Sequence, residues 1–160
     1  MATTIEKRAE SIAKHGTIEK AIEANAIAQY QTITVSEAIV LGLLRQRVTK
    51  YFGIFGHGST DIAEVLRVYE EHGLVTTYNV RHETAAAHAA TVLNMLTGEV
   101  GAVVTSIGPG ALHAFAVHLR QLLTVLAYII FMAMKQRTVK ASTCSKFQKM
   151  NRVYFLNCAV

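Results

Sequence analysis

Between residues 51 and 116 one pattern of strand and helix signals recurs three times, and it limits the possible folds to a few. In each repeat a short apolar run is followed by a turn of glycine or polar residues and then by the start of a helical pattern. The apolar runs are residues 51–55, 74–80 and 100–107, and the first two helical patterns are residues 60–71 and 83–96. Strands that alternate with helices of ten or more residues form βαβ units. The sequence therefore predicts an α/β fold, a parallel sheet flanked by helices.

The residues before this rhythm differ in pattern. Residues 1–32 carry apolar side chains at helical spacing, interrupted at residues 16–17, which predicts an N-terminal helical extension of two short amphipathic helices. The domain itself is expected to begin at residue 33. Within it, Ser36 is a suitable N-cap for a helix that runs to about Arg47.

Three loops follow the predicted strands, at residues 56–60, 81–84 and 105–111. The carboxyl ends of parallel strands meet at one edge of a sheet, and ligands of such sheets bind there. We therefore expect the three loops to build one site.

Glu83 is the candidate catalytic residue, because it stands at the strand end and at the start of an alanine-rich helix. The alanines at residues 85–87, 89 and 90 would let a flat ring approach, and apolar surroundings raise a carboxyl pKa by desolvation. The helix N-terminus lowers that pKa instead. An isolated glutamate at this position would most simply cap its helix, and the flanking sequence is what favours a chemical role.

Two motifs in combination carry a family resemblance. Arg81-His82-Glu83 is followed about 25 residues later by Thr105-Ser106-Ile107-Gly108-Pro109-Gly110-Ala111. This order resembles the pyrimidine-binding domain of thiamine diphosphate enzymes of the acetolactate synthase group. The resemblance covers residues 33–116 and implies a thiamine diphosphate-binding fold of the pyrimidine type, present here incompletely.

The resemblance also implies roles for particular residues. The cofactor would be thiamine diphosphate, with Glu83 bonded to its aminopyrimidine ring and activating it. Pro109 and His113 occupy positions that lie along the cofactor, although the family usually has asparagine at position 113. Mg²⁺ and the diphosphate would be held by a second domain, usually that of a partner subunit, through a GDG...N motif that is not present in this sequence.

The loop Gly56-His57-Gly58 stands where acetolactate synthases show a tyrosine-proline-glycine-glycine turn, and it is similar to the loop of trihydroxycyclohexanedione hydrolases. His57 either contacts substrate or cofactor or is a solvated turn residue, and both interpretations stay open. The remaining histidines, among them His82 and His88, show no metal-ligand spacing, so no protein-held metal site is expected.

Composition changes abruptly near residue 117. Residues 1–116 hold 9 Lys/Arg and all 11 Asp/Glu, whereas residues 117–160 hold 7 Lys/Arg, no acid and no glycine. Restoring one base before codon 117 in a permitted back-translation turns the tail into GSFAAASDGVGVYHIYGDE and an uninterrupted continuation, which has the glycines and acids of a globular domain. We therefore expect residues 117–160 to be an out-of-frame tail of a truncated enzyme, or else residues 122–134 to be a genuine buried helix or strand.

The expected function is that of a thiamine diphosphate-binding fragment of an enzyme that makes or breaks carbon–carbon bonds in 2-oxo acids or cyclic diones. The expected partner is a second copy of the chain or the diphosphate-binding domain of a partner subunit, in the cytoplasm. One alternative is a non-catalytic remnant or pseudogene product without cofactor binding of its own. Another, a small nucleic-acid-binding protein, is favoured by the net charge of +5 alone and opposed by the confinement of that charge to one tail. The longest apolar run, residues 122–134, falls short of the roughly 20 residues of a membrane span.

Overall fold

The computed structural model describes residues 4–121, 129–132 and 154–155. In this part of the chain five strands form one parallel sheet in the order β2-β1-β3-β4-β5. This confirms the predicted α/β class with a parallel sheet. The elements in chain order are α1 Thr4–His15, α2 Ile18–Glu23, α3 Val35–Arg45, β1 Lys50–Gly53, α4 Thr60–Glu71, β2 Thr76–Asn79, α5 Glu83–Thr97, β3 Gly101–Thr105, α6 Pro109–Gln121, β4 Ile129–Met132 and β5 Tyr154–Phe155.

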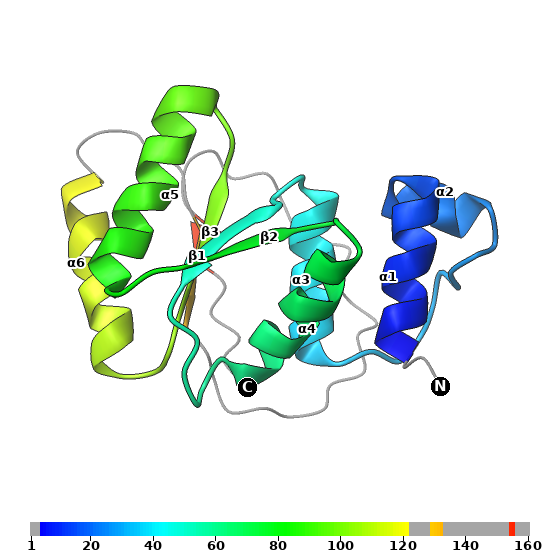
Figure 1. Cartoon of the computed structure of the whole chain (residues 1–160), viewed down its shortest axis with the longest axis horizontal. Helices are drawn as coiled ribbons and strands as arrows, with labels where there is room; N and C mark the ends of the chain where they lie inside the picture. Colours follow the sequence, from blue (N-terminus) through cyan, green and yellow to red (C-terminus); the bar gives the residue numbers. More distant parts are fainter. Residues whose placement is uncertain (1–3, 122–128, 133–153, 156–160) are drawn as a thin grey trace.

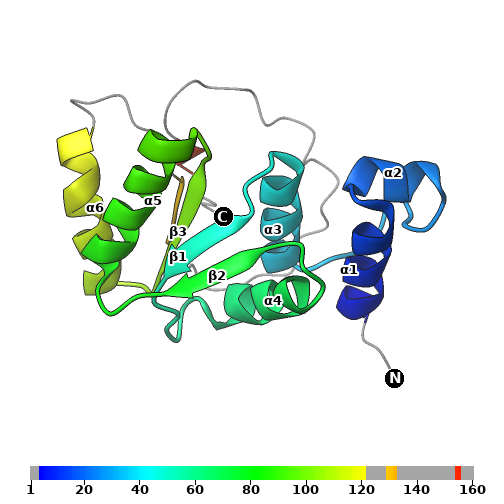
Figure 2. The ribbon, with the colours of Figure 1, turned by 45° about the horizontal axis from the view of Figure 1, so that its top comes forward.

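Helices cover both faces of the sheet. Helices α5 and α6 lie on one face and α3 and α4 on the other, with α1 and α2 beyond α3 (Figures 1 and 2). Successive strand residues point to opposite faces. In β1, Tyr51 joins the core under α3 and α4, whereas Phe52 joins the core under α5 and α6. Val104 and Val103 of β3 divide in the same way, so both cores depend on the two central strands.

The N-terminal helices pack into the first of these cores. Ala9, Ile12 and Ala21 are fully or almost fully buried in it. A buried ion pair adds to this contact: Arg8 Nε donates to Glu37 Oε1 over 2.6 Å and Nη2 donates to Oε2 over 2.9 Å, with the side chains 6% and 1% exposed. The predicted extension is therefore joined to the domain by both apolar and charged contacts.

The first domain helix starts earlier than predicted. Thr34, and not Ser36, is its N-cap, and the Thr34 hydroxyl accepts from the Glu37 N–H over 3.2 Å. Ser36 is buried within the first turn. Both residues are good caps by type. Glu37, whose N–H bonds to the Thr34 cap, is also the partner of Arg8.

Helix α6 runs through the composition boundary, because it continues from Pro109 to Gln121. Residue 117 therefore lies inside an element rather than between two elements. Of the run at residues 122–134, only the residues of β4 are described, and they pair in parallel with β3. The rest of that run lies outside the described residues, as do Cys144 and Cys158. Among the helices described, none is long and apolar enough to cross a membrane.

Candidate functional site

The loops after β1, β2 and β3 all leave the sheet at its carboxyl edge, because these strands are parallel neighbours. The first and third loops touch. A Cβ at Gly56 would lie 2.5 Å from the Ser106 hydroxyl oxygen, so this approach requires a glycine at position 56. The first loop is closed by Ser59, whose hydroxyl accepts from the Gly56 N–H over 3.0 Å.

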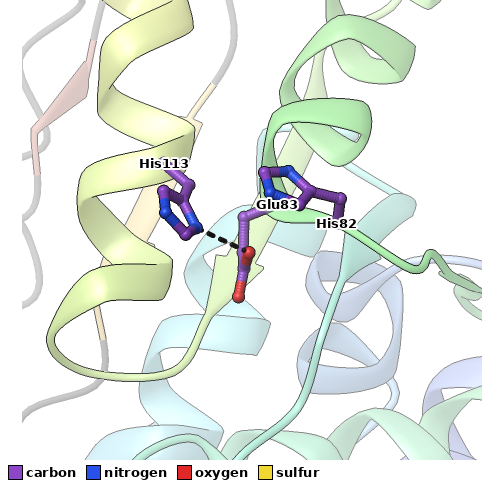
Figure 3. Close-up of side chains that lie close together, drawn as sticks. All are labelled: His82, Glu83 and His113. Carbon is purple, nitrogen blue, oxygen red and sulfur yellow. Dashed lines mark hydrogen bonds and ion pairs between the residues drawn. The ribbon is translucent and has the colours of Figure 1, made fainter.

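Glu83 is the first residue of α5, and its position is set by the cap before it. His82 has extended backbone at the N-cap, and its ring Nδ1 accepts from the Thr84 N–H over 3.2 Å. The Glu83 side chain is 14% exposed and lies between the N-terminal turns of α5 and α6 (Figure 3). Its Oε2 lies 3.4 Å from His113 Nδ1. Thr84 and His113 join the same two helices through a hydroxyl-to-carbonyl bond of 3.4 Å.

Gly110 makes room for the carboxylate. A Cβ at this position would lie 2.5 Å from Glu83 Oε1 and 3.2 Å from its carboxyl carbon. Any side chain at position 110 would therefore displace the end of the Glu83 side chain. The Gly108-Pro109-Gly110 turn therefore serves the site by leaving space for the Glu83 carboxylate, because Gly110 has no side chain.

The pKa of the Glu83 carboxyl is lowered from its ordinary value. The largest cause is a hydrogen bond from its own backbone N–H; burial acts in the opposite direction, and His113 and His82 lower the pKa further. Of the two opposing effects expected from the sequence, the lowering by the helix N-terminus outweighs the raising by apolar surroundings. The buried alanines Ala86, Ala87 and Ala90 face the sheet, whereas the carboxylate meets the N–H groups and imidazoles of the helix ends.

The predicted site residues divide into two groups. Glu83 and His113 are brought together with Gly110, and Pro109 is the exposed first residue of α6, one turn from His113. Gly56, His57 and Gly58 form the turn against Ser106. The His57 ring is exposed, and its carbonyl oxygen accepts from the Thr60 hydroxyl over 3.2 Å.

His82 lies beside Glu83 and His113, a position to which the sequence analysis gave no weight. Its ring stacks on that of His113 at a centroid distance of 4.8 Å and an interplanar angle of 24°. One ligand-type atom from each of His82, Glu83 and His113 lies within 4.8 Å of the others (Figure 3). The expectation of no metal site rested on spacing along the chain. That spacing carries no signal here, since His113 comes from another helix.

A cavity of about 590 Å³ lies elsewhere, between the N-terminal helices, the segment before α3, and α3. Its lining includes Arg8, Ile12, Ile22 and Leu41 and no residue of the three loops. The chemistry-bearing side chains therefore gather at the sheet edge and not in this cavity. A largely shielded carboxylate beside an imidazole can accept, hold and return a proton.

Comparison with known proteins bears on this arrangement. The family described as "Thiamine pyrophosphate enzyme, N-terminal TPP binding domain" matches residues 33–119. An acetolactate synthase large subunit of Parasynechococcus marenigrum (strain WH8102) is 37% identical over 95 residues, which are 59% of this chain and 15% of that protein. The acetolactate synthase isozyme 3 large subunit of Escherichia coli (strain K12) is 38% identical over 84 residues, 52% of this chain and 14% of that protein. The chain thus spans about one seventh of the length of these relatives, and the family resemblance of its two motifs is confirmed.

Proposed function

This chain belongs to the family of N-terminal TPP binding domains of thiamine pyrophosphate enzymes, and we propose from this that it holds the pyrimidine half of thiamine diphosphate within a complete enzyme. The observation that carries the proposal is the placement of Glu83 at the carboxyl edge of the sheet, between the ends of α5 and α6. The family as such implies thiamine diphosphate as the cofactor. The role of each residue is our inference.

The residues present fit an aminopyrimidine ring. Such a ring needs a carboxylate at its ring nitrogen and open space beside it. Glu83 provides the carboxylate, and the missing side chain of Gly110 leaves its Oε1 free of a neighbouring Cβ. His113 holds the other carboxylate oxygen at 3.4 Å, which keeps Oε1 available to a ligand.

When bound, thiamine diphosphate supplies a carbon nucleophile for attack on a carbonyl. The part of this chain in that chemistry is proton placement at the pyrimidine. Glu83 exchanges a proton with the ring nitrogen, and Gly110 and His113 fix the direction of its side chain. In the chain alone the lowered pKa keeps Glu83 ionised. A second domain closing over the site would remove water and raise that pKa toward the value a proton carrier needs.

The parent reaction that we propose makes or breaks a carbon–carbon bond in a 2-oxo acid or a cyclic dione. The acetolactate synthase relatives support the first substrate class. The Gly56-His57-Gly58 loop supports the second, because a histidine in that turn offers a substrate contact that a proline does not. Mg²⁺ and the diphosphate would be bound outside this chain, by a domain of a partner subunit.

The decisive variant for this proposal is Glu83→Gln in a complete enzyme that contains this domain. Glutamine keeps the shape of the side chain and loses its ability to carry the proton, so turnover should fall by about two to four orders of magnitude while folding is retained. Glu71→Gln, at an exposed glutamate that pairs with Arg67, is the matched control and should keep normal turnover. Equal turnover of the Glu83 variant and the control would remove the proposed role.

The alternative function is that of a non-catalytic remnant or pseudogene product that binds no cofactor of its own. Calorimetry on a complete enzyme that contains this domain, and not on this chain alone, separates the two hypotheses. The 160-residue chain alone should show no micromolar affinity for thiamine diphosphate on either hypothesis, since about 8 kcal/mol would have to come from half a site. A complete enzyme with this domain should bind the cofactor if our proposal holds and should not bind it if the domain is a remnant.

A further inference from the structure

We propose that His82, Glu83 and His113 form a binding site for a divalent transition-metal ion such as Zn²⁺, a property that goes beyond the proposed cofactor role. Two imidazoles and one carboxylate are a ligand set that zinc accepts, with a fourth position left to water. Imidazole nitrogen also suits Ni²⁺ and Cu²⁺. The three side chains come from two helices that converge at the sheet edge (Figure 3).

The geometry is close to what the ion requires. Bonds of about 2.0–2.1 Å in a tetrahedral arrangement place neighbouring ligand atoms about 3.3 Å apart. Glu83 Oε2 and His113 Nδ1 already lie 3.4 Å apart. The ligand atoms of all three residues lie within 4.8 Å of one another, so closure needs movement of about 1.5 Å. His82 and His113 are exposed, which gives the ion a direct path from solvent.

Two electrostatic contributions to metal binding act in opposite directions. The N-termini of α5 and α6 present positive dipole ends, which disfavour a cation by a modest amount at an exposed site. The ionised Glu83 carboxylate brings a full negative charge into the cluster, and its Coulomb attraction for a divalent ion exceeds the effect of the partial charges.

Metal binding has a local structural consequence at the cap of α5. His82 Nδ1 accepts a hydrogen bond of 3.2 Å from the Thr84 N–H. An ion at Nδ1 takes that lone pair, and an ion at Nε2 moves the ring proton onto Nδ1. Either mode removes this cap bond, so the Thr84 amide reports on coordination by His82.

The test is a Zn²⁺ titration of the full 160-residue chain at neutral pH, with Cys144 and Cys158 changed to serine in every sample to remove thiolate binding. We expect one ion per chain, and at least about tenfold weaker binding in each of His82→Asn and His113→Asn. His88→Asn changes an exposed histidine of α5 that lies outside the cluster. It is the matched control and is expected to bind Zn²⁺ as the parent does.

A second readout keeps the result independent of folding effects. Far-ultraviolet circular dichroism should be unchanged in all three variants, and Zn²⁺ should shift the Thr84 amide resonance in the parent and in His88→Asn. Absence of binding in the parent, or equal binding by parent, His82→Asn and His113→Asn, would overturn the proposal. Because no thiamine cofactor is present, neither outcome bears on the proposed function.

Discussion

At the scale of single residues, the groups that face the Glu83 carboxylate determine the direction of its pKa shift. Its own N–H and the His113 ring favour the ionised form, and this outweighs the burial of a side chain that is 14% exposed. The residue types alone indicated two opposing effects on its pKa, desolvation by alanines and the helix N-terminus, but not which of them prevails. The direction depends on whether alanines or helix-end N–H groups surround the carboxyl, and only the packing of α5 against the sheet decides that.

The lowered pKa of Glu83 predicts a pH-dependent contribution to stability. A carboxyl whose folded-state pKa is depressed stabilises the fold above its unfolded-state pKa, and the contribution is lost as pH falls through the folded-state pKa. Glu83→Gln should therefore lower the free energy of unfolding by about 0.3–1 kcal/mol at pH 7 and low salt. Denaturant unfolding of both proteins should show the difference vanish in acid, below the ordinary glutamate pKa. A difference that stays constant down to pH 3 would contradict this assignment.

At the scale of elements, the spacing of apolar residues predicted the strands and helices better than residue type predicted where a helix begins. The three-strand rhythm was right because alternation of apolar runs and amphipathic helices reflects burial on both sheet faces. The predicted cap of α3 was wrong because Thr34 and Ser36 are equally suitable by type, and residue type does not select between them. The pairing of His82 with His113 could not be predicted, since it arises from α5 and α6 lying side by side.

The last residue of β3 has a buried hydroxyl group that is not hydrogen-bonded among the described residues. This residue, Thr105, is fully buried. Replacing it with valine keeps the shape and removes the buried hydroxyl, so Thr105→Val should raise the free energy of unfolding by about 1 kcal/mol. Thr91→Val is the matched control, because the Thr91 hydroxyl donates to the Ala87 carbonyl over 2.8 Å and its removal should bring no gain. Loss of stability in Thr105→Val would show that this hydroxyl is bonded in solution.

At the scale of the whole molecule, the N-terminal helices are held to the domain by a charged group inside the core. Glu37 accepts from Arg8 and also from the Tyr69 hydroxyl over 3.2 Å. Burial, with the neighbouring Glu37 charge, raises the pKa of Tyr69. Removing one partner of such a pair leaves an uncompensated buried charge, which is far more costly than replacing both.

Arg8→Met should therefore lower the free energy of unfolding by about 3–5 kcal/mol, and the double variant Arg8→Met with Glu37→Met should recover most of that loss. Equilibrium unfolding in urea measures both. If the single and double variants are equally destabilised, the pair contributes through packing alone and its charge does not matter.

The composition shift at residue 117 leads to a prediction about the gene. We propose that the tail is read out of frame, since residues 117–160 contain 7 basic residues and neither an acid nor a glycine, and since the family match ends at residue 119. Sequencing the DNA around codon 117 and beyond should reveal that one restored base opens a long frame with a GDG...N segment. A native frame without such a continuation would show the tail to be genuine.

The role proposed for Glu83 is to move the proton by which bound thiamine diphosphate is activated. The test is the rate at which the hydrogen on the reactive carbon of the bound cofactor exchanges with deuterium, in a complete enzyme that contains this domain and in its Glu83→Gln variant. We predict equal cofactor occupancy, fast exchange in the parent and exchange slower by at least about a hundredfold in the variant. Equal exchange rates at equal occupancy would show that Glu83 does not move this proton.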